Sequence, residues 1–203
     1  MAYKLLRINA SASLDSSTSR KLADQLQSSL QQQRQDVAVS ERNLHAQLPM
    51  IDAEWIEASY TPEEQRSERQ KAVLELSDQL IAEIEQADHI LLATPMYNFS
   101  APAALKAWID MIARVGKTFQ YTETGPQGLI ADKPVTLVVT TGGTPINSGY
   151  DFLSGYLERI FNFIGISNVT LIAADRMNID ADAATAQALE QIETHASITS
   201  QAA

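Results

Sequence analysis

The sequence predicts an α/β fold in which helices cover both faces of a five-stranded parallel sheet. Short apolar runs of the kind that form buried parallel strands recur along the chain. Between successive runs lie segments in which apolar residues are three and four positions apart, the period of an amphipathic helix. Strands that alternate with helices in this way favour a parallel sheet.

The chain shows no internal repeat and no low-complexity segment, and its 203 residues suit one hydrophobic core. We therefore expect a single domain that spans residues 1–203. The expected strands are residues 4–9, 36–42, 89–93, 134–140 and 168–174. The expected helices are residues 20–34, 61–86, 102–115, 150–164 and 182–199.

Local signals justify these elements in order. Residues 36–42 alternate apolar and polar side chains, as a half-exposed edge strand does. Thr61 is expected to cap the second helix, with Pro62 in its first turn. The run at residues 89–93 has the length and flanks of a buried strand, and Pro102 suits the first turn of the helix that follows.

Two segments are long for connections in a compact domain. Residues 43–60 are irregular in pattern; they form a wall of the active site, a subunit contact, or a surface excursion that packs Trp55 onto the body. Residues 116–128 form a glycine-containing loop with Phe119 and Tyr121. Aromatic residues in such a loop indicate a lid or a dimer contact, or anchor the loop.

Composition excludes several classes of function. The net charge is −10 and no cluster of Lys and Arg stands out, so we expect no nucleic-acid partner. The chain has no cysteine, and His45, His89 and His195 lack the spacing of metal ligands, so we expect no metal. No signal peptide and no run of membrane-spanning length is visible, so we expect a soluble cytoplasmic protein with no membrane partner.

A hydroxyl-rich loop at residues 10–19 joins the first strand to the first helix. The amides and the positive dipole end of a helix N-terminus favour anions such as phosphate. The loop lacks Gly-x-Gly-x-x-Gly, which argues against a dinucleotide and for one phosphate. The simpler alternative is that Ser17 or Ser19 only caps the helix. The candidate phosphate ligands are Ser11, Ser17, Thr18 and Ser19.

Two further loops should meet this one at the carboxyl edge of the sheet. The first contains Met96, Tyr97, Asn98 and Phe99, and the second contains Thr140, Thr141, Gly142 and Gly143. In a flavodoxin-like three-layer sandwich of strand order 2-1-3-4-5, FMN binds at this switch point. Aromatic faces, an amide and exposed glycine backbone suit its flat ring, so we expect FMN as the bound cofactor.

Several motifs resemble the FMN-dependent NADH-azoreductase family of flavodoxin-like quinone and azo reductases. The resemblance spans nearly the whole chain, and the Pro-Met-Tyr-Asn-Phe run is its most specific part. The motifs are Ser11, Ser17-Thr18-Ser19, Pro95 to Phe99, Lys106 to Asp110, Gly116 to Phe119, Tyr121-Thr122 with Gly125-Pro126, and Phe163 to Ile166.

The resemblance implies an enzyme that transfers hydride from NADH or NADPH, through N5 of FMN, to quinones and azo compounds. The cycle would be ping-pong, with azo bonds cleaved to aromatic amines and no obligate catalytic side chain. The hydroxyl-rich loop at residues 10–19, called the serine loop below, would hold the phosphate. The loops that contain residues 96–99 and 140–143 would line the flavin. The resemblance also implies a homodimer in which Phe119, Tyr121 and the Phe163 region line the substrate slot.

The chain departs from the family's pattern at one loop. Family members commonly carry Ser-Arg-Gly-Gly where this chain has Thr140 to Gly143, and a histidine where Thr144 and Pro145 stand. The glycine backbone should still bind FMN without that arginine. Two other readings stay open, a flavodoxin-type carrier of single electrons to a protein partner, and an α/β interaction or sensor module without a cofactor.

Overall fold

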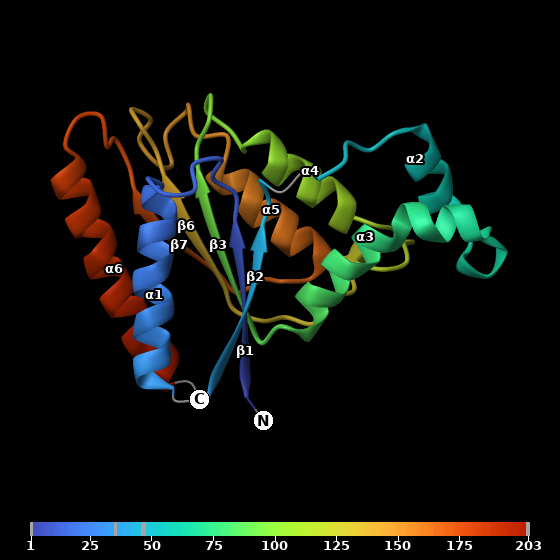
Figure 1. The fold of residues 1–203 in the computed structure, drawn as a ribbon, viewed down its shortest axis with the longest axis horizontal. Coiled ribbons are helices and arrows are strands. Elements are labelled where there is room, and N and C mark those ends of the chain that lie inside the picture. Colours follow the sequence, from blue (N-terminus) through green and yellow to red (C-terminus); the bar gives the residue numbers. More distant parts are fainter. Residues whose placement is uncertain (1, 35, 46–47, 202–203) are drawn as a thin grey trace.

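The computed structural model describes residues 2–34, 36–45 and 48–201, with side chains described up to residue 196. Five parallel strands form the main sheet, in the order β2-β1-β3-β6-β7 (Figure 1). They are β1 (Tyr3–Asn9), β2 (Val37–Asn43), β3 (His89–Pro95), β6 (Val135–Thr140) and β7 (Val169–Ala174). The predicted flavodoxin-like α/β fold with a parallel sheet is confirmed.

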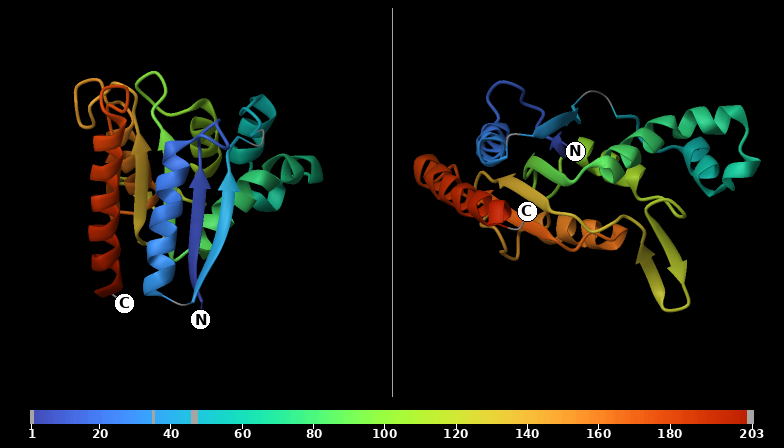
Figure 2. Two further views of the ribbon diagram at one scale, coloured as in Figure 1. Left: turned by 60° about the vertical axis from the view of Figure 1, so that its left-hand side comes forward. Right: turned by 90° about the horizontal axis from the view of Figure 1, so that it is seen from below.

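Helices cover both faces of this sheet. On one face α1 (Thr18–Gln33) and α6 (Ala181–Gln201) lie side by side, with a core that includes Leu5 and Val138 (Figures 1 and 2). On the other face α3 (Glu68–Gln86), α4 (Ala103–Ile112) and α5 (Ser154–Ile164) pack around Leu6, Leu92 and Trp108. Adjacent strand residues such as Leu5 and Leu6 face opposite layers, because side chains alternate along a strand.

The predicted strand order 2-1-3-4-5 needs one correction. The loop at residues 116–128 contains an antiparallel hairpin of β4 (Phe119–Thr122) and β5 (Gly125–Gly128), which forms its own two-stranded sheet. The hairpin projects from the body (Figure 2, right). The strands that follow it along the chain are therefore β6 and β7. The hairpin was missed because two of the four β5 residues are glycines and one is proline, residues depleted in strands.

The segment at residues 43–60, expected to be irregular, contains helix α2 (Ala53–Tyr60). The side chain of Asp52 accepts the amide of Trp55 at 2.8 Å and so caps this helix. Trp55 and Ala58 pack against Leu74 of α3 in a small separate core. So short a helix depends on this packing rather than on local propensity, which explains why the sequence pattern did not show it.

The next helix begins later than predicted. The hydroxyl of Thr61 donates to the carbonyl of Glu57 at 2.8 Å, so Thr61 ends α2. A single 3₁₀ turn, η1 (Glu63–Gln65), follows, and α3 starts at Glu68. Ser67 and Gln70 form a reciprocal capping box there, which satisfies backbone N–H groups that Thr61 was expected to serve.

Two other helix boundaries differ from the prediction. Helix α4 ends at Ile112, because the hydroxyl of Thr118 donates to the carbonyl of Ile112 and accepts the amide of Arg114. Helix α5 begins at Ser154, because Asp151 accepts the amides of Leu153 and Ser154. The residues before Ser154 therefore form a loop at the carboxyl edge of the sheet. In the described part of the chain, no helix is both long and apolar enough to cross a membrane.

Candidate functional site

The carboxyl ends of β1, β3 and β6 lie next to one another. Asn9 of β1 pairs with Ala93 of β3, and Pro95 at the end of β3 pairs with Thr140 of β6. The loops that leave these strands therefore meet at one edge of the sheet (Figure 1). Loops at this edge bind ligands in open α/β sheets.

The loop after β1 brings its hydroxyls to the start of α1. Ser11, Ser17 and Ser19 are buried, and Thr18 is half-buried. Ser17 caps α1, since its Oγ accepts the amide of Arg20 at 3.3 Å, and the Oγ atoms of Ser17 and Ser19 lie 3.0 Å apart. The first turn of α1 carries no acidic residue, so nothing there opposes an anion.

The loop after β3 is a tight turn with a strained backbone. Tyr97 and Ser100 exchange two backbone hydrogen bonds of 3.0 Å, and the amide of Met96 donates to Thr140 at 2.8 Å. Asn98 and Phe99 have φ angles of 48° and 71°, a left-handed conformation that is uncommon outside glycine. Strain of this kind is concentrated at functional sites.

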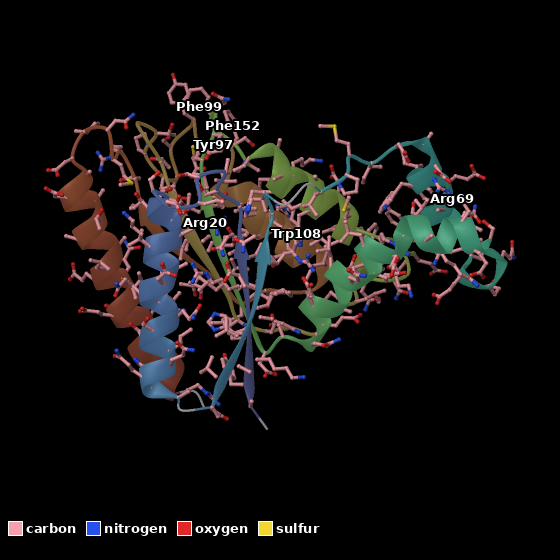
Figure 3. The ribbon with its side chains drawn as sticks, in the orientation of Figure 1. Arg20, Arg69, Tyr97, Phe99, Trp108 and Phe152 are labelled. Carbon is pink, nitrogen blue, oxygen red and sulfur yellow. The ribbon has the colours of Figure 1, made fainter. Side chains whose placement is uncertain are left out.

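That turn buries Met96 and leaves the other three side chains exposed. Tyr97 is 41% exposed and Phe99 is 50% exposed, so both large aromatic side chains present apolar surface at this edge. Asn98 is exposed as well. Figure 3 shows Tyr97 and Phe99 at the top of the molecule, beyond the strand ends. A planar ligand can therefore reach two aromatic rings and one amide.

The sequence analysis missed two aromatic residues beside this turn. The rings of Phe99 and Tyr150 lie 6.1 Å apart, and the amide of Phe152 donates to the carbonyl of Phe99 at 3.1 Å. Tyr150 and Phe152 are exposed, and Figure 3 shows Phe152 close to Phe99. Both had been assigned to helix α5. The loop conformation depends on the carboxylate of Asp151: burial raises its pKa, but donated hydrogen bonds, chiefly from Ser154 and Asn147, lower it overall.

The loop after β6 is fastened to the segment after β7. The hydroxyl of Thr141 donates to the carbonyl of Thr144 at 2.5 Å and accepts the amide of Arg176 at 2.9 Å. The amide of Asn178 donates to Gly142, where a Cβ would lie 2.8 Å from the Asn178 side chain. A Cβ at Gly143 would meet nothing within 4 Å. Thr141 is therefore a buried brace, and Gly143 is an exposed stretch of backbone.

Comparison with known proteins identifies the family. Residues 3–196 match the family with a flavodoxin-like fold. The chain is 49% identical over 189 residues to FMN-dependent NADH:quinone oxidoreductase 1 of Hahella chejuensis, covering 93% of each protein. It is 47% identical to the protein of the same name from Jannaschia sp., covering 93% of this chain and 96% of the relative. The chain belongs to this family of FMN-dependent NADH:quinone oxidoreductases.

Solved structures agree with the family assignment. An FMN-dependent NADH-azoreductase from Bacillus anthracis, in complex with FMN, aligns with a TM-score of 0.87 and 26% identity over 98% of this chain and 99% of that one. A second azoreductase from Bacillus anthracis aligns with the same TM-score at 24% identity, over 96% and 98% of the two chains, and shows the shared fold.

The residues expected to line the family's substrate slot lie in a separate cluster. The ring of Phe119 lies 4.3 Å from that of Phe163 and 5.6 Å from that of Tyr121. A cavity of about 410 Å³ beside Phe119 and Tyr121 is lined by Ile51, by residues of α2 and by residues at and just after the end of α4, and by none from the loops after β1, β3 and β6. Within one chain, the structure does not bring these aromatic residues to the edge loops.

Among the described residues, no group of three or more His, Asp or Glu side chains is placed to hold a metal ion. His89 is buried between the helical layers and bonds to Thr136 rather than to the edge loops. The polar groups that do converge at the edge are hydroxyls, backbone amides and the amide of Asn98. They suit an organic cofactor with a phosphate.

Proposed function

We propose that this chain is an FMN-dependent oxidoreductase that transfers hydride from NADH or NADPH to quinones and azo compounds. The observation that carries the proposal is the meeting of a hydroxyl-rich helix N-terminus with an exposed aromatic turn at the carboxyl edge of the sheet. The relatives at 49% and 47% identity, named FMN-dependent NADH:quinone oxidoreductases, support it.

The phosphate of FMN would lie at the start of α1. Ser11, Ser17, Thr18 and Ser19 are its proposed ligands, through their hydroxyls and the first-turn amides. Burial of three of these hydroxyls supports this assignment, because buried polar groups require hydrogen-bond partners. The bond between Ser17 and Ser19 and the amide of Arg20 that Ser17 accepts satisfy only part of the hydrogen-bonding capacity of these two hydroxyls.

The flavin ring would lie between the other two loops. Tyr97 and Phe99 offer aromatic faces, Met96 supports the turn from below, and Asn98 offers an amide that can donate and accept. Thr140, Thr141, Gly142 and Gly143 would approach the ring through their backbone, which the open space at Gly143 permits.

FMN supplies the hydride chemistry when bound, and the protein supplies binding, orientation and exclusion of water. We propose no side chain as an obligate acid or base for this reaction. Tyr97, Asn98 and Tyr121 are proposed to orient the reactants. Donor and acceptor would occupy the same slot in turn, and full cleavage of an azo bond to two amines would take two cycles.

We further propose that the enzyme is a homodimer. Phe119, Tyr121 and Phe163 form an aromatic cluster away from the edge loops of their own chain, so they can wall a slot only in a second copy. The exposed apolar side chains of α2 and the hairpin, among them Ile56 and Tyr121, support an interface on that side. Sedimentation of the wild type and of Tyr121→Glu tests it; a wild-type monomer at micromolar concentration rules the dimer out.

The experiment that tests the function uses purified full-length protein. We expect a yellow protein whose colour is bleached by NADH without air and restored by menadione or an azo dye. Turnover with both nicotinamide donors would then establish the preference between them. Direct oxidation of NADH separates this function from a one-electron carrier, which needs a protein partner. A colourless protein that binds no added FMN would contradict the proposal.

A further inference from the structure

Arg20 follows directly after the serine loop, in the first turn of α1. Its side chain is half-buried and bonds back to the loop that precedes α1. One terminal nitrogen, Nη2, donates to the carbonyl of Ser11 at 3.2 Å, and the other, Nη1, donates to Oδ1 of Asn43 at 2.5 Å. Nη2 also lies 3.4 Å from Nδ1 of His45. The guanidinium therefore joins the serine loop to the end of β2.

A second arginine, Arg7, lies close to Arg20, but it forms an ion pair with Asp24. Arg7 of β1 is buried, and its Nη1 lies 2.5 Å from a carboxylate oxygen of Asp24. Its Nη2 donates to the carbonyl of Arg20 at 3.2 Å, and its Nε donates to Asn9. Glu41 accepts from the side-chain amides of Asn9 and Asn43, each at 2.8 Å. The side chain of Asn43 thus lies between the carboxylate of Glu41 and the guanidinium of Arg20 and bonds to both.

Arg20 itself has no carboxylate within ion-pair distance among the described residues. Its Nε is buried and has no hydrogen-bond partner in that part of the chain. Burial lowers the pKa of Arg20, but a guanidinium stays protonated in proteins. A partly buried cation without an ion-pair partner is costly in a folded protein, so its position beside an anion-binding loop calls for a functional reason.

We propose that Arg20 supplies the counter-charge for the phosphate of FMN and makes the serine loop select flavin mononucleotide over riboflavin. This inference rests on the proposed function. Hydroxyls and backbone amides hold a phosphate as neutral donors, whereas the guanidinium adds an attraction that depends on the charge of the ligand. Arg20 acts beside the four proposed phosphate ligands and is also a positioning residue, because it holds the carbonyl of Ser11.

The alternative role for Arg20 is a purely structural brace of the loop. A brace would support the whole flavin site, so its loss would weaken FMN and riboflavin alike. A counter-charge acts on the phosphate only, so its loss would weaken FMN alone. The ratio of the two affinities therefore distinguishes the roles, and the sensitivity of FMN binding to salt gives a second readout, because salt screens a charge.

The test compares wild type, Arg20→Gln and Arg20→Lys as full-length proteins, stripped of flavin and titrated with FMN or riboflavin by fluorescence quenching. We expect Arg20→Gln to weaken FMN binding by about tenfold or more, the effect of losing a charge-assisted interaction, with riboflavin binding changed by less than about twofold. Arg20→Lys should keep most of the FMN affinity. Added salt should weaken FMN binding to wild type more than to Arg20→Gln.

Arg42→Gln is the matched control. Arg42 lies on β2 next to Asn43, the residue that Arg20 contacts, but it pairs with Glu83 of α3, so the ratio of FMN to riboflavin affinity should not change. Equal weakening of both flavins in Arg20→Gln, or no weakening of FMN, would overturn the inference while leaving FMN binding by the wild type intact. A wild type that binds neither flavin would overturn the proposed function itself.

Discussion

The rings of Phe99 and Tyr150 lie 6.1 Å apart with their planes inclined by 40°, although the two residues come from the loops after β3 and β6. The backbone bond from Phe152 to Phe99, at 3.1 Å, fixes the two loops against each other. Both rings remain largely exposed, so they form an aromatic rim at the carboxyl edge rather than a piece of core. A planar acceptor bound over the flavin would contact this rim.

The first prediction concerns that rim. Tyr150→Ala should raise the KM for a bicyclic quinone by about two- to tenfold, the effect of one aromatic contact, while FMN affinity stays unchanged. Steady-state kinetics with a monocyclic and a bicyclic quinone measure it. Ile179→Ala serves as control, since Ile179 is also exposed and apolar but lies in the segment after β7. An equal change of KM for both quinones would argue against a rim contact.

The second prediction concerns the brace at Thr141. Thr141→Val removes the hydroxyl that donates to Thr144 and accepts from Arg176 in a buried place, while it keeps the side-chain shape. The free energy of unfolding should fall by about 1–3 kcal/mol, since buried partners lose their hydrogen bonds. Denaturant unfolding measures the loss. Thr124→Val, at an exposed hairpin position, should change stability by no more than about 0.5 kcal/mol.

The third prediction concerns pH. His89 is fully buried and its Nε2 lies 2.9 Å from the hydroxyl of Thr136, which is also 2.9 Å from Nε2 of His195. Burial, together with the nearby His195, lowers the pKa of His89 from 6.5 to about 4. Between pH 4 and pH 6.5, His89 is therefore mostly neutral in the folded state but protonated in the unfolded state. Stability from neutral His89 is present above pH 6.5 and is lost as the pH falls from 6.5 toward 4.

The size of this loss follows from the shift in pKa and amounts to roughly 3 kcal/mol at most. His89→Gln should reduce the fall in the free energy of unfolding between pH 7 and pH 5, as measured by urea unfolding at each pH. Burial also lowers the pKa of His195, so some dependence on pH should remain. His45→Gln is the control, because His45 is exposed. An unchanged pH profile in His89→Gln would contradict the prediction.

The fourth prediction separates two candidate starts for helix α3. Ser67→Ala should lower the free energy of unfolding by about 1 kcal/mol, because Ser67 caps α3 in a capping box with Gln70. Thr61→Ala should cost less, since the hydroxyl of Thr61 bonds to the end of α2 and to the side chain of Gln70 rather than to a backbone amide of α3. Thermal unfolding of the two variants measures the order. A larger loss in Thr61→Ala would contradict the assigned helix start.

The sequence by itself determined the elements whose signal is local. Buried strands such as residues 89–93 appear as short apolar runs, because both faces of a parallel sheet are covered. The place of the serine loop and of the Met96 to Phe99 turn follows from the strands they leave, so their meeting at one edge could be predicted. The loops at this edge and the family motifs both indicate FMN as the cofactor.

Tertiary structure decided the features that depend on distant partners. Helix α2 is held by packing on α3, and the hairpin β4–β5 has no strong strand propensity of its own. Tyr150 is exposed in a loop because Asp151 accepts the amide of Ser154, so α5 begins at Ser154 rather than at residue 150. No sequence pattern singles out Arg20, yet its side chain contacts Ser11 and Asn43. Such contacts join residues far apart in the chain, so no local pattern contains them.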